Sequence, residues 1–245
     1  MGAAGAGGAG AVAGASGSGG LAADCSAPTN INYEIRRVQS GSSLTIDGTC
    51  DETSWQAAPL MKFVGPSNTD NSTECRLLWD PSGSPRMFGC CVITDTDLQG
   101  VHTAHDSKVF NDDSVEYFLR PAPDASLTAG TVKIFINLLG TVYDQDFPGY
   151  NPAYEAGVLA KASLDGTLND SAADKGYTLE WSSVVSPLPL TTTEYRCAFA
   201  TNDTDGLADG GSTRTSAISF PGPSNTINDL ETWGKCSFSC LEAGQ

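Results

Sequence analysis

The sequence predicts an all-β protein: an antiparallel β-sandwich of two sheets, jelly-roll or immunoglobulin-like, held together by disulfides. Between about Asn30 and Cys240, short β-rich runs alternate with turn residues, and helical periodicity is almost absent. This spacing is typical of sandwiches and barrels. Eight cysteines form an even set, as in domains stabilised by disulfides. No internal repeat is evident, so residues 25–245 are expected to form one domain.

The predicted strands are β-branched or apolar runs bounded by turn residues. The run Ser43–Ile46 ends at the turn dipeptide Asp47-Gly48. Cys75–Trp79 and Met87–Ile93 flank the turn-rich segment Asp80–Pro85, which predicts a hairpin with a longer loop. Six further strands are expected at 114–119, 132–138, 158–163, 177–184, 195–200 and 232–237. Two exposed loops are expected at 121–129 and 203–215.

The tryptophans divide into core residues and one ambiguous residue. Glu52–Ala58 is expected to form a single helical turn that buries Trp55. Trp79 and Trp181 also lie in apolar patterns, so core packing is predicted for all three. Trp233 has two interpretations: a core residue, or an aromatic ring that contacts a ligand.

The cysteines favour disulfides over a metal site. They are Cys25, Cys50, Cys75, Cys90, Cys91, Cys197, Cys236 and Cys240. No CxxC pair is present, and His102 and His105 are the two histidines, so a zinc site has few ligands to use. Disulfides form in oxidising compartments. The protein is therefore expected to be secreted, either extracellular or attached to a cell surface.

Part of the disulfide pairing can be predicted. Cys90 and Cys91 are neighbours in a strand, so their side chains point to opposite faces and should bond to different partners. The hairpin closing at 80–85 sets Cys75 opposite one of them. Cys197 is expected to pair with one of the two cysteines near the end of the sequence.

The first residues have an unusual composition. Met1–Ala23 contains nine Gly and nine Ala, without Lys or Arg. This composition predicts a flexible leader or linker over residues 1–24. A charged start and an apolar core, which a signal peptide needs, are both missing from it. No stretch of the sequence is long and apolar enough to insert into a bilayer.

Charge excludes some partners. Thirteen Lys and Arg against 29 Asp and Glu give a formal net charge of −16 and a pI near 4.2. Such a surface repels nucleic acid and anionic membranes, and leaves neutral sugars and divalent cations as ligands. Several aspartates could supply oxygen ligands for calcium: Asp95, Asp97, Asp112, Asp113, Asp144 and Asp146. The absence of a DxDxDG loop favours the alternative, a solvated acidic surface.

Five motifs, in order along residues 30–240, resemble the family 9 carbohydrate-binding modules. They are IDGTCDETSW at Ile46–Trp55, RLLWD at Arg76–Asp80 with the strand that follows it, NDDSVEYFL at Asn111–Leu119, FINLLGTVYD at Phe135–Asp144 and KGYTLE at Lys175–Glu180. The resemblance implies a β-sandwich that binds sugars without cleaving them. Members are usually attached to polysaccharide-degrading enzymes, and some bind calcium structurally. A catalytic or anchoring domain in a longer protein is therefore an expected partner.

The resemblance also implies a sugar site. Aromatic rings bind sugars because the C–H faces of a pyranose are apolar, while polar groups beside them take the hydroxyls. The aromatic residue that precedes the third motif is Phe110, and the glutamate within it is Glu116. Phe110 could instead cap the sandwich, and Glu116 could be a solvent-face residue. The family's second aromatic is absent from its expected place, and Phe135 stands where a basic residue is expected.

Three further residues complete the candidate site. Trp233 could supply the missing aromatic, and Asn137 and Tyr143 flank a strand end where they could form a polar rim or a turn. No catalytic motif is evident, so the predicted function is non-catalytic binding of poly- or oligosaccharide ends. One alternative is a structural or adhesive surface domain that has lost sugar binding. Another is a haem-binding sandwich, whose axial ligands would come from Met61, Met87, His102 and His105.

Overall fold

The computed structural model describes residues 30–63, 70–121, 130–146, 153–185, 194–205, 216–222 and 232–244. The expected leader at 1–24, Cys25 and most of the two expected loops lie outside the described residues. Strands dominate the described chain, together with the short helix α1 (Thr53–Ala57) and the 3₁₀ turn η1 (Val109–Asn111). No helix in these ranges is long and apolar enough to span a membrane.

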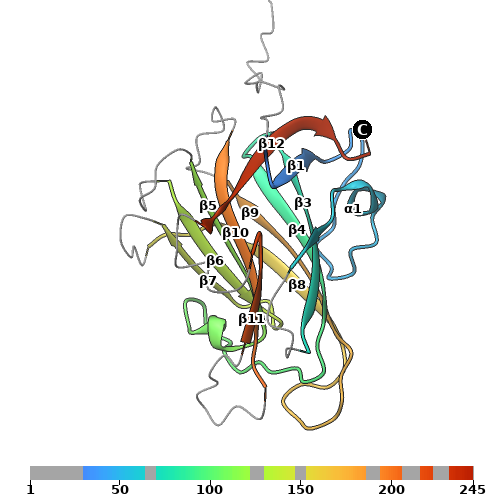
Figure 1. The fold of residues 1–245 in the computed structure, drawn as a ribbon, viewed down its shortest axis with the longest axis vertical. Coiled ribbons are helices and arrows are strands. Elements are labelled where there is room, and N and C mark those ends of the chain that lie inside the picture. Colours follow the sequence, from blue (N-terminus) through green and yellow to red (C-terminus); the bar gives the residue numbers. More distant parts are fainter. Residues whose placement is uncertain are drawn as a thin grey trace, which may run out of the picture.

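The strands form one strongly curled sheet (Figure 1). They are β1 (Tyr33–Arg37), β2 (Met61–Lys62), β3 (Ser72–Asp80), β4 (Arg86–Thr94), β5 (Ser114–Pro121), β6 (Val132–Asn137), β7 (Val142–Asp146), β8 (Leu159–Asp165), β9 (Gly176–Val184), β10 (Tyr195–Asp203), β11 (Ser216–Phe220) and β12 (Gly234–Glu242). Their order is β7-β6-β5-β10-β12-β1-β3-β4-β9-β8, with β11 on β10 and β2 on β3.

The curl brings two layers face to face. We call β7, β6, β5, β10 and β11 layer A, and β3, β4, β9 and β8 layer B; β12 and β1 connect them. The predicted sandwich is confirmed, but it is not wholly antiparallel, because β1 runs parallel to both β12 and β3. Parallel neighbours need long connections. The chain provides them, since residues 38–71 separate β1 from β3, and β12 comes from the far end of the sequence.

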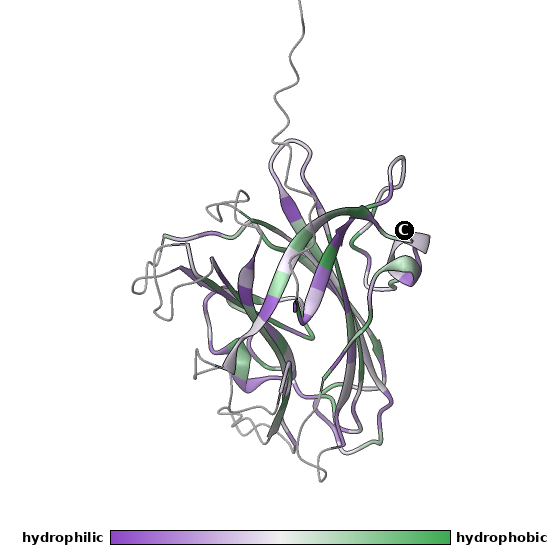
Figure 2. Ribbon diagram, turned by 45° about the horizontal axis from the view of Figure 1, so that its top comes forward, coloured by the Kyte–Doolittle hydropathy of each residue, from purple (hydrophilic) through white to green (hydrophobic). Residues whose placement is uncertain are grey.

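The main core lies between the layers. Val115, Tyr117 and Leu119 alternate along β5 with their side chains inward, and each is at most 1% exposed. Tyr117 stacks on Trp181 from β9, with ring centroids 5.8 Å apart, which ties layer A to layer B. A Cβ at Gly89 would lie 2.0 Å from the Trp181 ring, so only glycine fits beneath that indole. Figure 2 shows green and purple residues following one another along the strands, as this alternation requires.

Residues 38–58, here called the covering segment, lie over the outer face of layer B. Glu180 of β9 accepts hydrogen bonds from the backbone N–H of Asp47 (3.0 Å) and Gly48 (2.7 Å) and from Trp55 Nε1 (2.9 Å). Gly48 has φ +91°, and a Cβ there would lie 2.9 Å from the Ala162 backbone. Trp55 is 1% exposed, so the predicted core role is confirmed.

Most of the predicted elements are present. Every strand predicted after residue 70 exists, although β12 begins at Gly234, two residues later than expected, and α1 matches the predicted helical turn. The strand predicted at Ser43–Ile46 is wrong. Its Thr45 N–H donates to the Glu52 carboxylate (2.7 Å), so this backbone group is satisfied by a side chain. The exposed loop expected from residue 203 is also wrong at its start, because Asp203 and Thr204 are each 1% exposed.

The disulfides follow the predicted pairing. Cys75 bonds to Cys91 across the β3–β4 hairpin, while Cys90 bonds to Cys50 of the covering segment. The neighbouring cysteines therefore have different partners on opposite faces of β4, as expected. Cys197 bonds to Cys236, which joins β10 to β12. Cys240 is disulfide-bonded as well.

Candidate functional site

The outer face of layer A carries a cluster of aromatic rings. Phe135 of β6 lies opposite Glu116 of β5 and Tyr143 of β7 in the strand register. Its ring centroid is 5.5 Å from that of Tyr143 and 5.5 Å from that of Phe110. Phe118 extends the cluster to Trp233, with centroids 5.5 Å apart. We call Phe110, Phe118, Phe135, Tyr143 and Trp233 the aromatic face.

Buried polar groups hold Phe110 in place. Phe110 lies in η1, and the buried Asp112 that follows accepts hydrogen bonds from the His102 N–H (3.0 Å) and from Asn137 Nδ2 (2.7 Å). Asn137 Oδ1 accepts in turn from the N–H of Thr141 (2.8 Å). Asn137 is fully buried. Of the two interpretations of this residue, the structure therefore supports the turn and not the rim.

The rings differ in how far they are exposed. Phe110 and Tyr143 are half-buried, with centroids 6.1 Å apart and planes at 88°. Phe135 and Trp233 are 5% and 3% exposed. The Trp233 ring instead lies 5.6 Å from the guanidinium of Arg120, a cation–π contact. The aromatic face therefore presents two rings to solvent, and Trp233 supports them from within the cluster.

Polar groups accompany the rings. Glu116 is 2% exposed, and its carboxylate accepts a hydrogen bond from Asn202 Nδ2 of β10. Lys133 Nζ lies 4.9 Å from the centroid of Phe135 and is half-buried. The Tyr143 hydroxyl donates to Gln145 Oε1 (3.2 Å). Glu116 thus forms part of the floor of the aromatic face, while Lys133 and Gln145 lie at its surface.

An acidic cluster lies where the two layers meet at one end. Asp95 follows β4, Asp113 precedes β5 and Asp203 ends β10, and their carboxylate oxygens lie within 4.8 Å of one another. All three are at most 1% exposed. Asp95 Oδ1 accepts from the Asp97 N–H (3.0 Å), whereas the buried Asp95 Oδ2 has no hydrogen-bond partner among the described residues. Either a bound cation or protonation would relieve the repulsion among three buried carboxylates at this distance.

Titration in this cluster is strongly shifted. Burial raises the pKa of Asp95 to about 7, and the negative charges of Asp203, Asp70 and Asp205 add to the effect. Burial likewise raises the pKa of Asp113 to about 9, and Asp95 contributes further. Ionised carboxylates are disfavoured here without a positive charge, so a bound cation would be accompanied by proton release.

The six aspartates considered as calcium ligands do not lie in one cluster. Asp95 and Asp113 meet in the acidic cluster, whereas Asp112 binds His102 Nδ1 (2.7 Å) and Asp144 lies in a separate group on β7. Asp97 Oδ1 accepts from Gln99 Nε2, and Asp146 ends β7. Asp203 was missed, because its position in a polar, glycine-rich run resembles a loop and only the β5–β10 pairing brings it to Asp113.

Two other features lie away from the aromatic face. Met61 and Met87 are buried in the core between the layers and His102 is held by Asp112, so three of the four candidate haem ligands have other structural contacts. On the outer face of layer B, a hollow of about 590 Å³ is lined by Leu44, Phe88, Leu159 and Lys161, among others. Phe88 is its one aromatic residue, so it offers no pair of rings.

Over residues 46–240, the chain matches the family described as carbohydrate family 9 binding domain-like. The chain belongs to this family. A family 9 carbohydrate-binding module from Caldicellulosiruptor kristjanssonii in complex with cellotriose has a TM-score of 0.61 at 18% identity, covering 86% of this chain and 94% of that one. A complex of a family 9 module from the same organism with glucose gives 0.58 at 18% identity, covering 86% and 97%.

A solved structure from Bacteroides uniformis gives a TM-score of 0.58 at 14% identity, covering 86% of this chain and 100% of that one. Likeness at such identities shows the shared fold alone. No curated protein matches the chain significantly. In this family 9 domain the shared motifs make internal contacts: Trp55 of the first motif meets Glu180 of the last, and Asp112 of the third meets Asn137 of the fourth.

Proposed function

We propose that this family 9 domain binds neutral carbohydrate, without cleaving it, on the aromatic face of layer A. The observation that carries the proposal is the pair of half-buried rings, Phe110 and Tyr143, on the outer face of layer A beside the three buried rings of the aromatic face. Apolar sugar faces stack on such rings. The family is one of sugar-binding domains. Related modules have been solved with cellotriose and with glucose, so glucose-based oligosaccharides are the first ligands to test.

Each candidate residue receives a role under this proposal. Phe110 and Tyr143 supply the stacking surface, and Lys133 and Gln145 beside them offer hydrogen bonds to hydroxyls. Glu116, on the floor of the aromatic face, accepts a hydrogen bond from a sugar hydroxyl in addition to the one from Asn202 Nδ2. Trp233 packs beneath the exposed rings, and Asn137 stabilises the turn after β6. Because only a small area is buried, the dissociation constant is expected to be on the order of 1 mM.

The test compares two half-buried phenylalanines on opposite outer faces. Cellotriose is titrated into wild type, Phe110→Ala and Phe88→Ala, and binding is followed by chemical shifts in NMR spectra. Phe110→Ala is expected to weaken binding at least about tenfold, because stacking area is lost. Phe88→Ala is the matched control, since it removes a ring from the hollow on layer B. Binding lost in Phe88→Ala and retained in Phe110→Ala would move the site to layer B.

The same titration addresses the alternative function. If no neutral oligosaccharide binds wild type at millimolar concentration, the structural or adhesive interpretation replaces sugar binding. The replacement of the family's basic residue by Phe135 favours that outcome, because an apolar ring cannot donate to a hydroxyl. The disulfides support secretion to the outside of the cell or its surface. We propose, as for other members of the family, attachment to a catalytic or anchoring domain.

We also propose that the acidic cluster holds a structural calcium ion. Asp95, Asp113 and Asp203 would supply its oxygen ligands, and the unpartnered Asp95 Oδ2 supports the fit. Asp95 belongs to layer B, whereas Asp113 and Asp203 belong to layer A. A cation here would therefore neutralise the repulsion among the three carboxylates and tie the layers together at this end.

A further inference from the structure

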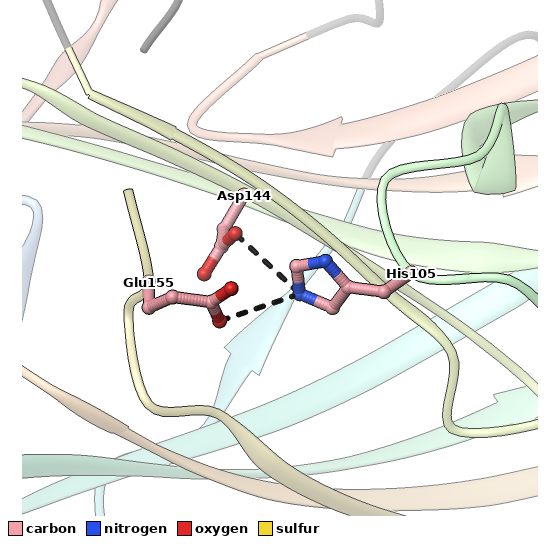
Figure 3. Close-up of side chains that lie close together, drawn as sticks. All are labelled: His105, Asp144 and Glu155. Carbon is pink, nitrogen blue, oxygen red and sulfur yellow. Dashed lines mark ion pairs between the residues drawn. The ribbon is translucent and has the colours of Figure 1, made fainter. Parts of the chain in front are cut away.

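A second group of metal-ligand side chains lies at the edge of layer A, away from the acidic cluster. His105 comes from the loop before η1, Asp144 from β7, and Glu155 from the segment that leads to β8. Figure 3 shows one ring nitrogen of His105 directed at both carboxylates. The Nε2 atom lies 3.7 Å from Asp144 Oδ1 and 3.7 Å from Glu155 Oε2.

These distances do not correspond to hydrogen bonds. An N–H···O bond spans about 2.7–3.2 Å, so a gap of 3.7 Å is too long for one. Asp144 is 2% exposed, and within the described ranges its Oδ1, which faces the gap, has no hydrogen-bond partner. A buried carboxylate oxygen in that condition is costly unless a positive charge compensates it. Around a tetrahedral zinc ion with bonds of about 2.0–2.1 Å, donor atoms lie about 3.4 Å apart, close to the spacing here.

The surrounding groups orient the three ligands. Asp144 Oδ2 accepts a hydrogen bond from the Ala156 N–H (2.6 Å), which leaves Oδ1 directed at the gap. Asp106 Oδ2 lies 3.5 Å from His105 Nδ1, and Asp106 Oδ1 accepts from the Asp144 N–H (3.3 Å). A carboxylate that accepts from the distal nitrogen is the usual support for a metal-bound imidazole, and Asp106 lies on that side of the ring, at 3.5 Å just beyond hydrogen-bond distance. Burial raises the pKa of Asp144, and the His105 charge opposes this shift.

We propose that His105 Nε2, Asp144 Oδ1 and Glu155 Oε2 form a binding site for a zinc-class divalent ion. One imidazole with two carboxylates suits zinc better than calcium, which prefers oxygen ligands alone. Glu155 and His105 keep solvent contact, with side chains 70% and 44% exposed, so the ion has an entry path and room for a water ligand.

The position in the fold gives the ion a structural role. Ala156 lies on the segment that passes from layer A to layer B, where its carbonyl accepts from the Val184 N–H of β9 (2.8 Å). A metal ion would clamp this crossing segment, β7 and the loop that leads to Phe110 against one another.

The test is calorimetric titration of zinc into the chelator-treated whole chain, with calcium present in excess to occupy the acidic cluster. One zinc ion is expected to bind, with a dissociation constant on the order of 1 µM. Zinc at about a hundred times its dissociation constant should raise the melting temperature by roughly 5–10 °C. The imidazole resonances of His105 should shift on binding while those of His102 do not.

Matched variants separate the site from adventitious binding. Glu155→Gln is expected to weaken zinc binding at least about tenfold, and His105→Ala to abolish it. Glu155 is exposed, so the first change leaves the fold intact even if the second does not. Glu74→Gln and His102→Gln are the controls, an exposed glutamate and the other histidine, and both should retain wild-type affinity. Equal losses in variants and controls, or unchanged binding in Glu155→Gln, would overturn the proposal.

Discussion

The outer faces of the two layers differ in how far other parts of the chain cover them, although both are built from the same alternation of side chains. On layer B the covering segment covers part of the sheet, and beneath it Trp55 and Glu180 are at most 1% exposed. On layer A the rings of Phe110 and Tyr143 remain half-buried. A covered surface adds to stability, and its polar groups bond to other groups of the protein. An exposed aromatic surface keeps contact area for a ligand. Variants on the two faces should therefore differ in which property they change.

Trp55→Ala should have the largest effect on stability. It removes a buried indole and leaves Glu180 Oε1 without the donor at 2.9 Å, so a loss of about 3–5 kcal/mol in unfolding free energy is expected. Urea denaturation measures the loss, with Phe110→Ala as the comparison from the open face. The folded fraction should bind cellotriose as wild type does. A larger loss in Phe110→Ala than in Trp55→Ala would reverse the assignment of the faces.

The disulfide that fastens the covering segment should come next. Cys50 and Cys90 are 40 residues apart in sequence, so the double change Cys50→Ser and Cys90→Ser should cost about 2–4 kcal/mol. The reason is the larger freedom of the unfolded chain, together with a loosened segment in the folded one. Chemical denaturation under oxidising conditions measures it, and sugar affinity should stay unchanged. Loss of binding at full folding would show that sealing supports the aromatic face.

The sequence predicted the layers far better than the sites. Runs such as Cys75–Trp79 are apolar and end at a turn-rich segment, which is local chemistry alone, and the β3–β4 hairpin and its cystine followed from it. The floor of the aromatic face depends on strand pairing over long sequence distances. Asn202 meets Glu116 because β10 pairs with β5, and no local pattern encodes that. Asp203 of the acidic cluster was not predicted for the same reason. Glu155 was not predicted because it lies in a connecting segment, where the bond from the Ala156 N–H to Asp144 holds the chain.

If the proposed calcium ion binds, it should change stability at the end where Asp95, Asp113 and Asp203 meet. Without it, the raised pKa values of Asp95 (about 7) and Asp113 (about 9) mean that the native state holds more protons than the unfolded one. Stability should therefore fall as the pH rises from about 5 to about 9. Calcium at a hundred times its dissociation constant should restore about 2.7 kcal/mol of unfolding free energy at the upper end of this pH range, and the dependence of stability on pH should become weaker.

Thermal melts across this pH range, with calcium or with a chelator, measure both effects. Asp95→Asn is the control, because a neutral amide cannot ionise. It should reduce the slope without calcium, leaving the part that Asp113 contributes, and lose most of the response to calcium. An identical pH profile with and without the ion in wild type would leave the cluster as a protonated carboxyl network.

The smallest effect is expected from Glu116→Gln, on the floor of the aromatic face. The amide keeps the shape of the side chain and an oxygen that accepts from Asn202, so unfolding free energy should change by less than about 1 kcal/mol. A hydroxyl that donates to a carboxylate makes a stronger bond than one that donates to an amide, so sugar affinity should fall about tenfold. NMR titration with cellotriose and urea denaturation measure the two quantities on the same sample. If stability falls while affinity is unchanged, Glu116 serves only the pairing of β5 with β10, and the stacking surface of Phe110 and Tyr143 must act with Lys133 and Gln145 alone.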